Sequence, residues 1–165
     1  MNIDSSTAAR IEGKSKPLED IVNKIVYNHT AELQSVMHKI RQCTKDDTPE
    51  LTDIEIEQIM LELPLLLFDV TDDQELVGMQ SDFASQLYKE AYNESFKDAR
   101  GTISDKNTSA ELNSMIQKLD SQIYDRAYKI IKQKVSLAIE TLNAVKKVQS
   151  TRQQKSDLGK TLSRF

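Results

Sequence analysis

Apolar residues recur three and four positions apart from Leu18 onward, and this spacing predicts an amphipathic helix that ends near Gln42. A polar stretch follows it. Thr52 and Glu55 then have the spacing of a capping box, in which each side chain accepts a hydrogen bond from the other residue's backbone amide. The box predicts a short helix over residues 53–63. Pro64 is expected to end or kink it, since proline has no amide hydrogen and clashes one turn back.

The second half of the chain predicts two longer helices. Thr71 and Gln74 form another capping signature, and the helix that follows is expected to stop near Arg100 and Gly101. Residues 102–109 read as a polar connector. Thr108 and Glu111 form a third box that opens the last helix, which runs to about residue 154. Two long helices with a short connector predict an antiparallel hairpin.

The expected organisation is therefore all-α. It consists of a disordered polar arm at 1–17, N-terminal helices at 18–70, a long helical hairpin at 71–154 and a frayed basic tail at 155–165. Apolar positions on the last helix alternate in steps of three and four, as in a coiled coil, with interruptions at Lys134 and Thr141. This stripe is the predicted interface of a homo-oligomer, and its members are Ile116, Leu119, Ile123, Ile130, Leu137 and Val145.

Composition supports this architecture. The chain of 165 residues has no tryptophan, four glycines and three prolines, which is too little turn chemistry for a many-stranded β fold. Only 38% of residues are hydrophobic, so long helices that complete their burial in an oligomer fit better than one compact core. The N-terminus has no signal-peptide pattern, and the longest apolar run, residues 63–68, is too short to span a membrane. With a single cysteine, Cys43, these features predict a soluble cytoplasmic protein.

Charge is divided unevenly along the chain. From Lys118 to the end there are eleven basic and four acidic residues, a balance of +7, whereas the preceding 117 residues balance at −11. Such asymmetry favours an anionic partner for one end, or electrostatic self-assembly. A simpler reading is that cations near a helix C-terminus complement the helix dipole and keep the helix soluble.

The spacing of the cations suits a polyanion backbone, because each phosphate contact releases counterions. The candidate nucleic-acid-binding residues of the last helix are Arg126, Lys129, Lys132, Lys134, Lys146, Lys147 and Arg152. Tyr124 and Tyr128 lie one turn apart among them. Aromatic residues at this spacing stack on bases in some proteins, but they more often pack in a core.

Enzymatic signatures are absent. The chain has no glycine-rich phosphate loop, and His29 and His38 do not share a metal-ligand spacing with Cys43. Two aspartate pairs, Asp46 with Asp47 and Asp72 with Asp73, are explained by helix capping. We therefore expect a non-enzymatic protein without cofactor or metal.

Two segments carry a family resemblance: LYKEAYNESFKDARGTISDKNTSAELN at 87–113 and YDRAYKIIKQKVSLAIETLNAVKKVQSTR at 124–152. Together they resemble the helical hairpin of phage recombination-mediator proteins similar to UvsY. The resemblance implies an oligomer that binds single-stranded DNA and helps to load a recombinase onto strands covered by a single-strand-binding protein, in the host cytoplasm. It also implies DNA contacts near the hairpin, where the matching basic residues are Lys89, Lys97, Arg100 and Lys106.

Two other classes of protein share these features. A phage scaffold or other assembly protein also combines long helices, acidic character and a basic C-terminal end. A coiled-coil adaptor is the third possibility. Salt-dependent binding to single-stranded oligonucleotides separates the first class from the other two.

Overall fold

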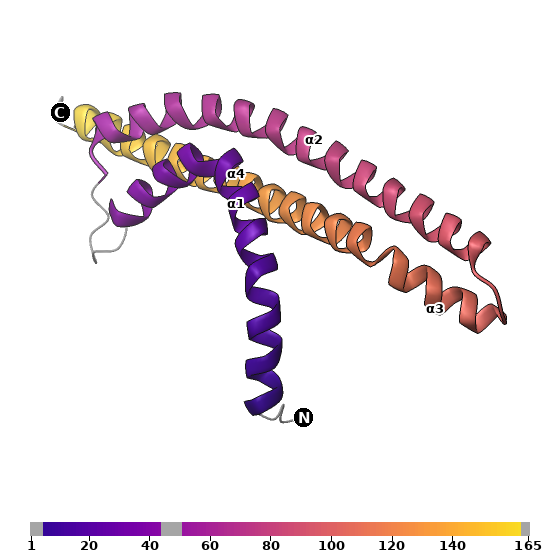
Figure 1. Ribbon diagram of the computed structural model, residues 1–165. Helices are drawn as coiled ribbons and strands as arrows, with labels where there is room; N and C mark the ends of the chain where they lie inside the picture. The colour runs from indigo at the N-terminus through magenta and orange to yellow at the C-terminus, as the bar shows by residue number, and fades with distance from the viewer. Residues whose placement is uncertain (1–4, 44–50, 163–165) are drawn as a thin grey trace. The chain divides into compact units, whose positions relative to one another are not determined.

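The computed structural model describes residues 5–43 and 51–162, and these form four helices joined by short connections (Figure 1). The helices are α1 (Ser5–Cys43), α2 (Asp53–Asp98), α3 (Ile103–Asn113) and α4 (Met115–Leu162). None of the described residues lies in a strand, so the all-α class predicted from the sequence is confirmed. No helix in this part of the chain combines the length and the apolar character needed to cross a membrane.

The chain divides into two compact units, and α1, α2 and α4 each contribute one segment to both. Unit 1 contains Met1–His29 and Asp73–Ile131, and therefore all of α3. Its core is built mainly from small side chains, because valine and alanine allow helix backbones to approach closely. The fully buried side chains of this unit are those of Val77, Ala110, Ser114, Ala127 and Ile131.

Unit 2 contains Thr30–Asp72 and Lys132–Phe165. Its core uses larger aliphatic residues, which bury more apolar area each. On α2 the buried positions recur every seven residues, at Ile56, Leu63 and Val70, so that one line of side chains faces the core. The other core residues of unit 2 include Leu33, Val36, Ile40, Leu51, Ile59, Val135, Ala138, Leu142 and Val145.

The sequence predicts that Pro64 ends or kinks its helix, and the helix does not end there. Figure 1 shows α2 as one uninterrupted helix. Its bounds, Asp53–Asp98, include both Pro64 and Thr71. Pro64 is exposed, and helical backbone around it keeps Leu63 and Val70 in the buried line. This burial offsets the lost hydrogen bond to the Met60 carbonyl. Thr71 consequently caps nothing: its hydroxyl donates to the Leu67 carbonyl one turn back.

Both ends of the described chain are more helical than the sequence predicts. The helix α1 begins at Ser5 and runs through Pro17, where a disordered arm was expected. Ser15 and Leu18, on either side of the proline, line a groove between α1 and α4 within unit 1. At the other end α4 continues to Leu162 through a segment expected to fray. The predicted arm and tail also include residues 1–4 and 163–165, which lie outside the residues that the structure describes.

Two of the three predicted capping boxes are wrong, and one is confirmed. The Thr52 amide donates to Glu55 Oε2 at 2.7 Å, and the Glu55 amide donates to Thr52 Oγ1 at 3.3 Å, so α2 opens as predicted. The box expected at Thr108 lies inside α3, where the Thr108 hydroxyl donates to the Ser104 carbonyl. The helix α3 instead opens within the predicted connector, at a box formed by Thr102 and Asp105.

Candidate nucleic-acid interface

Two candidate cations of α4 belong to unit 1. Lys129 Nζ lies 2.7 Å from Asp125 Oδ2, one turn away, and the Lys129 side chain is 61% exposed. Arg126 is exposed and lines the edge of a groove between α1 and α4. An exposed ion pair between residues four apart contributes only a few tenths of a kcal/mol. Asp125 therefore does not prevent Lys129 from exchanging its partner for a phosphate.

The other candidate cations of α4 belong to unit 2. Lys132, Lys146 and Lys147 are exposed, and Lys134 is half-buried. Within unit 2, Lys132 and Lys147 are fifteen residues apart, which is close to four helical turns, so both lie on the same side of α4. The positive charge of this helix is thus held where a polyanion can reach it.

Arg152 differs from the other candidates because it has a structural role in unit 2. Its Nη1 donates to the Leu51 carbonyl at 2.6 Å and to Asp53 Oδ1 at 2.8 Å. These bonds connect α4 to the residues that precede and open α2. A guanidinium fixed by a carbonyl and a carboxylate is less available to an external phosphate than an exposed lysine.

The second predicted patch lies where α2 turns into α3. Lys89, Lys97 and Arg100 are exposed, and Lys106 is half-buried with its Nζ 5.9 Å from the centre of the Phe96 ring. The turn itself uses Gly101, whose φ of 111° favours glycine. Carboxylates are as frequent as cations here: residues 94–106 contain three of each. This region is therefore locally neutral, unlike α4.

A row of aromatic residues on α2 organises this end of unit 1. Tyr88, Tyr92 and Phe96 are four residues apart, and neighbouring ring centres are 6.2 and 6.5 Å apart. The Tyr92 hydroxyl donates to Asn107 Oδ1 at 3.1 Å, and Lys118 Nζ lies 5.9 Å from the centre of the Tyr88 ring. This row was not predicted from the sequence, although the four-residue spacing of its aromatic residues indicates a shared face of a helix.

The two tyrosines proposed as stacking or core residues are both half-buried. A Cβ placed on Gly78 of α2 would lie 3.2 Å from Cε2 of the Tyr128 ring, so this ring packs closely on the backbone of α2. Because one part of the Tyr128 ring packs on this backbone, little of the ring is free to stack on a base. For Tyr128 the structure favours the core reading over stacking.

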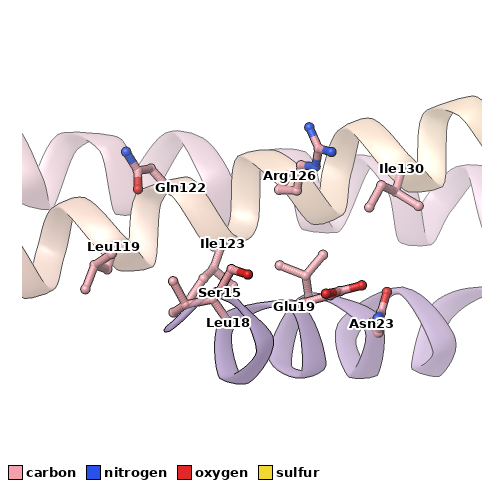
Figure 2. A pocket seen from close by; sticks show the side chains of 10 residues that line it. Ser15, Leu18, Glu19, Asn23, Leu119, Gln122, Ile123, Arg126 and Ile130 are labelled. Atoms are coloured by element: carbon pink, nitrogen blue, oxygen red, sulfur yellow. The ribbon is translucent and has the colours of Figure 1, made fainter. Parts of the chain in front are cut away.

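The six predicted interface residues occupy three different environments. Val145 is buried in unit 2, and Ile116 and Leu137 are 71% and 56% exposed. The remaining three line a groove of about 470 Å³ between α1 and α4 within unit 1. Figure 2 shows Ile123 close to Leu18 of α1, with Leu119 and Ile130 on either side along α4. Part of the predicted oligomer stripe thus serves contacts inside the chain.

The described residues contain no cluster of side chains that could hold a metal ion. Hydrogen bonds from the Thr52 amide and hydroxyl lower the pKa of Glu55, and bonds from the Thr102 hydroxyl and amide lower the pKa of Asp105.

The capping role proposed for Asp72 and Asp73 is wrong, since both lie inside α2, where Asp73 Oδ2 is 3.1 Å from His29 Nδ1. Asp46 and Asp47 lie outside the described residues.

Comparison of the chain with protein-family models, curated proteins and solved structures finds no match in any of the three.

Proposed function

We propose that this protein binds single-stranded DNA as a homo-oligomer and acts as a non-enzymatic accessory protein of phage recombination. The observation that carries the proposal is the charge of α4, which has ten basic and four acidic residues over Met115–Leu162. Lys129, Lys132 and Lys147 are exposed on it. A long helix with cations on its solvent side suits a nucleic-acid backbone, where affinity comes from displaced counterions.

The mechanism requires no chemistry from the protein. Several protomers contact one strand, and the effective concentration of each further site makes weak phosphate contacts add to a useful affinity. A strand held in this way is presented to a recombinase while a single-strand-binding protein is displaced. Both of these partners belong to the proposal because of the resemblance to UvsY-like mediators.

The proposal includes an antiparallel hairpin. Within unit 1, three contacts support it: Phe96 with Lys106, Tyr88 with Lys118, and Gly78 with Tyr128. From one contact to the next the α2 residue moves back along the chain while its partner moves forward, as an antiparallel pair requires. The exposed apolar residues Ile116 and Leu137 are the remaining candidates for the oligomer contact of α4.

The test compares two sets of substitutions by fluorescence anisotropy with a labelled oligothymidylate. Changing Lys129, Lys132 and Lys134 together to alanine is expected to weaken binding and to flatten its dependence on salt. For each phosphate of a single strand that the protein no longer binds, the slope of log K against log salt falls by about 0.7. Sedimentation of the same variant is expected to show an unchanged mass.

Changing Lys97 and Arg100 to alanine is the matched comparison, because it tests the patch at the turn between α2 and α3. A loss of affinity confined to this variant places the DNA site there. Unchanged affinity and salt slope in both variants rule out DNA binding by these patches. An assembly protein or adaptor predicts negligible binding by the wild type at physiological salt.

A further inference from the structure

The first part of α2, in unit 2, exposes large apolar side chains on the side away from its buried line. Leu61, Leu65 and Phe68 are 74%, 70% and 69% exposed, and their spacing of four and three residues places them on one face. Ile54, 68% exposed and two turns before Leu61, extends this face. We call the four residues the outer stripe of α2. Single exposed apolar residues need no explanation, but a row of them rimmed by polar residues indicates an interaction surface.

The outer stripe is not part of the core-forming pattern of the helix. Leu63 is fully buried and Val70 is 5% exposed, while Leu65 and Phe68 lie between them in sequence and point elsewhere. Serine or glutamate at the outer positions would leave the buried line intact. The residues of the stripe are therefore explained neither by the stability of unit 2 nor by the DNA contacts proposed for α4.

Acidic residues border the outer stripe. Residues 53–72 contain six acidic residues and no basic residue. Exposed carboxylates lie one turn from members of the stripe: Glu57 precedes Leu61 by four residues, Asp69 follows Leu65 by four, and Asp72 follows Phe68 by four. Glu62 is exposed as well. A ligand of this face must offer apolar groups in the centre and positive charge at the edges.

We propose that the outer stripe of α2 is a docking site for a basic amphipathic helix of a partner protein. A helix with leucine-like residues on one side and lysines or arginines along its borders meets both requirements of the surface. The acidic border repels anionic surfaces such as nucleic acids and acidic membranes, so this site is distinct from the one proposed on α4. Phe68 and Leu65 are the expected anchors, because exposed large apolar residues contribute most where a partner covers them fully.

The test uses a defined peptide of about five helical turns, made of leucine and lysine with one tryptophan, whose leucines lie on one side. The protein has no tryptophan, so fluorescence of the peptide reports binding without background. Titration calorimetry is expected to give one peptide per chain at micromolar affinity. Binding is expected to weaken from about 50 mM to about 500 mM NaCl, as exposed charge pairs are screened. A peptide of the same pattern with glutamate in place of lysine is not expected to bind.

Substitutions locate the site. Replacing Leu65 and Phe68 by serine is expected to weaken binding of the lysine peptide by at least about tenfold, since both anchors are removed. Neutralising Glu62, Asp69 and Asp72 as Gln, Asn and Asn is expected to weaken it and to remove most of the salt dependence. The control is serine at Leu112, which is 68% exposed in unit 1 and has no carboxylate three or four residues away in the sequence. Circular dichroism melts show whether each variant is folded.

Three results overturn the proposal. The first is an absence of peptide binding by the folded wild type, and the second is equal weakening in the control variant. The third is a wild-type oligomer that becomes monomeric when Leu65 and Phe68 are changed, because a second copy of the chain then covers the stripe. None of these results bears on the affinity of α4 for DNA, which the anisotropy experiment measures separately.

Discussion

Arg152 and Asp53 are joined by a hydrogen bond of 2.8 Å between Nη1 and Oδ1, and the same nitrogen donates to the carbonyl of the buried residue Leu51. The two acceptors are not equivalent. Asp53 is 83% exposed and regains water if the arginine is removed, whereas the Leu51 carbonyl depends on its partner. Arg152 therefore stabilises unit 2 through its bond to this carbonyl.

We expect Arg152→Ala to lower the free energy of unfolding by about 1–3 kcal/mol, because it leaves the Leu51 carbonyl without its donor. Asp53→Asn removes only an exposed ion pair and is expected to cost less than about 1 kcal/mol. Urea denaturation followed by circular dichroism measures both values. Equal losses would show that the carboxylate, and not the carbonyl, is the important acceptor.

The register of α4 can be tested at two adjacent residues of unit 1. Ile131 is fully buried, and Ile130 is half-buried at the groove against α1. Replacing Ile131 by alanine is expected to cost about 2–5 kcal/mol, since it leaves a cavity in the core. The same change at Ile130 is expected to cost about 1 kcal/mol. A larger effect at Ile130 would support the stripe inferred from the sequence over the buried face seen in the structure.

Gly78 and Tyr128 test how closely α2 and α4 approach in unit 1. Alanine at Gly78 gains up to about 1 kcal/mol of helix propensity, but its Cβ presses on the Tyr128 ring. We therefore expect a small net effect for Gly78→Ala and a loss of roughly 1–3 kcal/mol for Gly78→Leu. In thermal melts, Tyr128→Ala is expected to restore part of the stability of the leucine variant and to destabilise the wild type. Additive effects of the two changes would show that the residues do not touch.

The two capping boxes predict how stability depends on pH. Bonds to the ionised side chains lower the pKa of Glu55 and of Asp105 in the folded state. The stabilisation is therefore complete above the ordinary pKa of each carboxyl and is lost as the pH falls through the lowered value. We expect the difference in melting temperature between wild type and Glu55→Gln to shrink from about pH 6 to about pH 2. Asp105→Asn should behave in the same way, and a constant difference would contradict the assignment.

The sequence predicted correctly those structural features that depend on a few neighbouring residues. The box at Thr52 needed only the side chain three positions later, and it lies where the sequence placed it. The helix does not end at Pro64, because burial of Leu63 and Val70 favours continued helix and depends on residues distant in sequence. The apolar periodicity of one helix does not show which other helices pack against it. The start of α3 was not predicted, because a capping box usually has glutamate or glutamine three residues after the cap, where α3 has Asp105.

For the candidate site on α4, the sequence indicated which residues are basic but not which residues are buried. Of the seven candidate cations of α4, five are exposed, and Lys134 and Arg152 are half-buried. The apolar stripe inferred from the sequence did not include Ile131 and Ala138, which are fully buried. Alanine is buried where helices approach closely, so size alone does not reveal which face is inside. The role of Arg152 could not be read from sequence, since its acceptor Leu51 is 101 residues away.

The turn at Gly101 also has a consequence for the speed of folding. Contacts beside it join residues close in sequence, such as Tyr92 and Asn107, which are 15 positions apart. Closing so short a loop costs little chain entropy, whereas the bond from Arg152 to Leu51 must close a segment of 101 residues. We therefore expect the end of unit 1 near Gly101 to form early and to act as the nucleus from which α2 and α4 pair. A strained side chain at Gly101 would then slow refolding, while the loss of Arg152 would mainly accelerate unfolding.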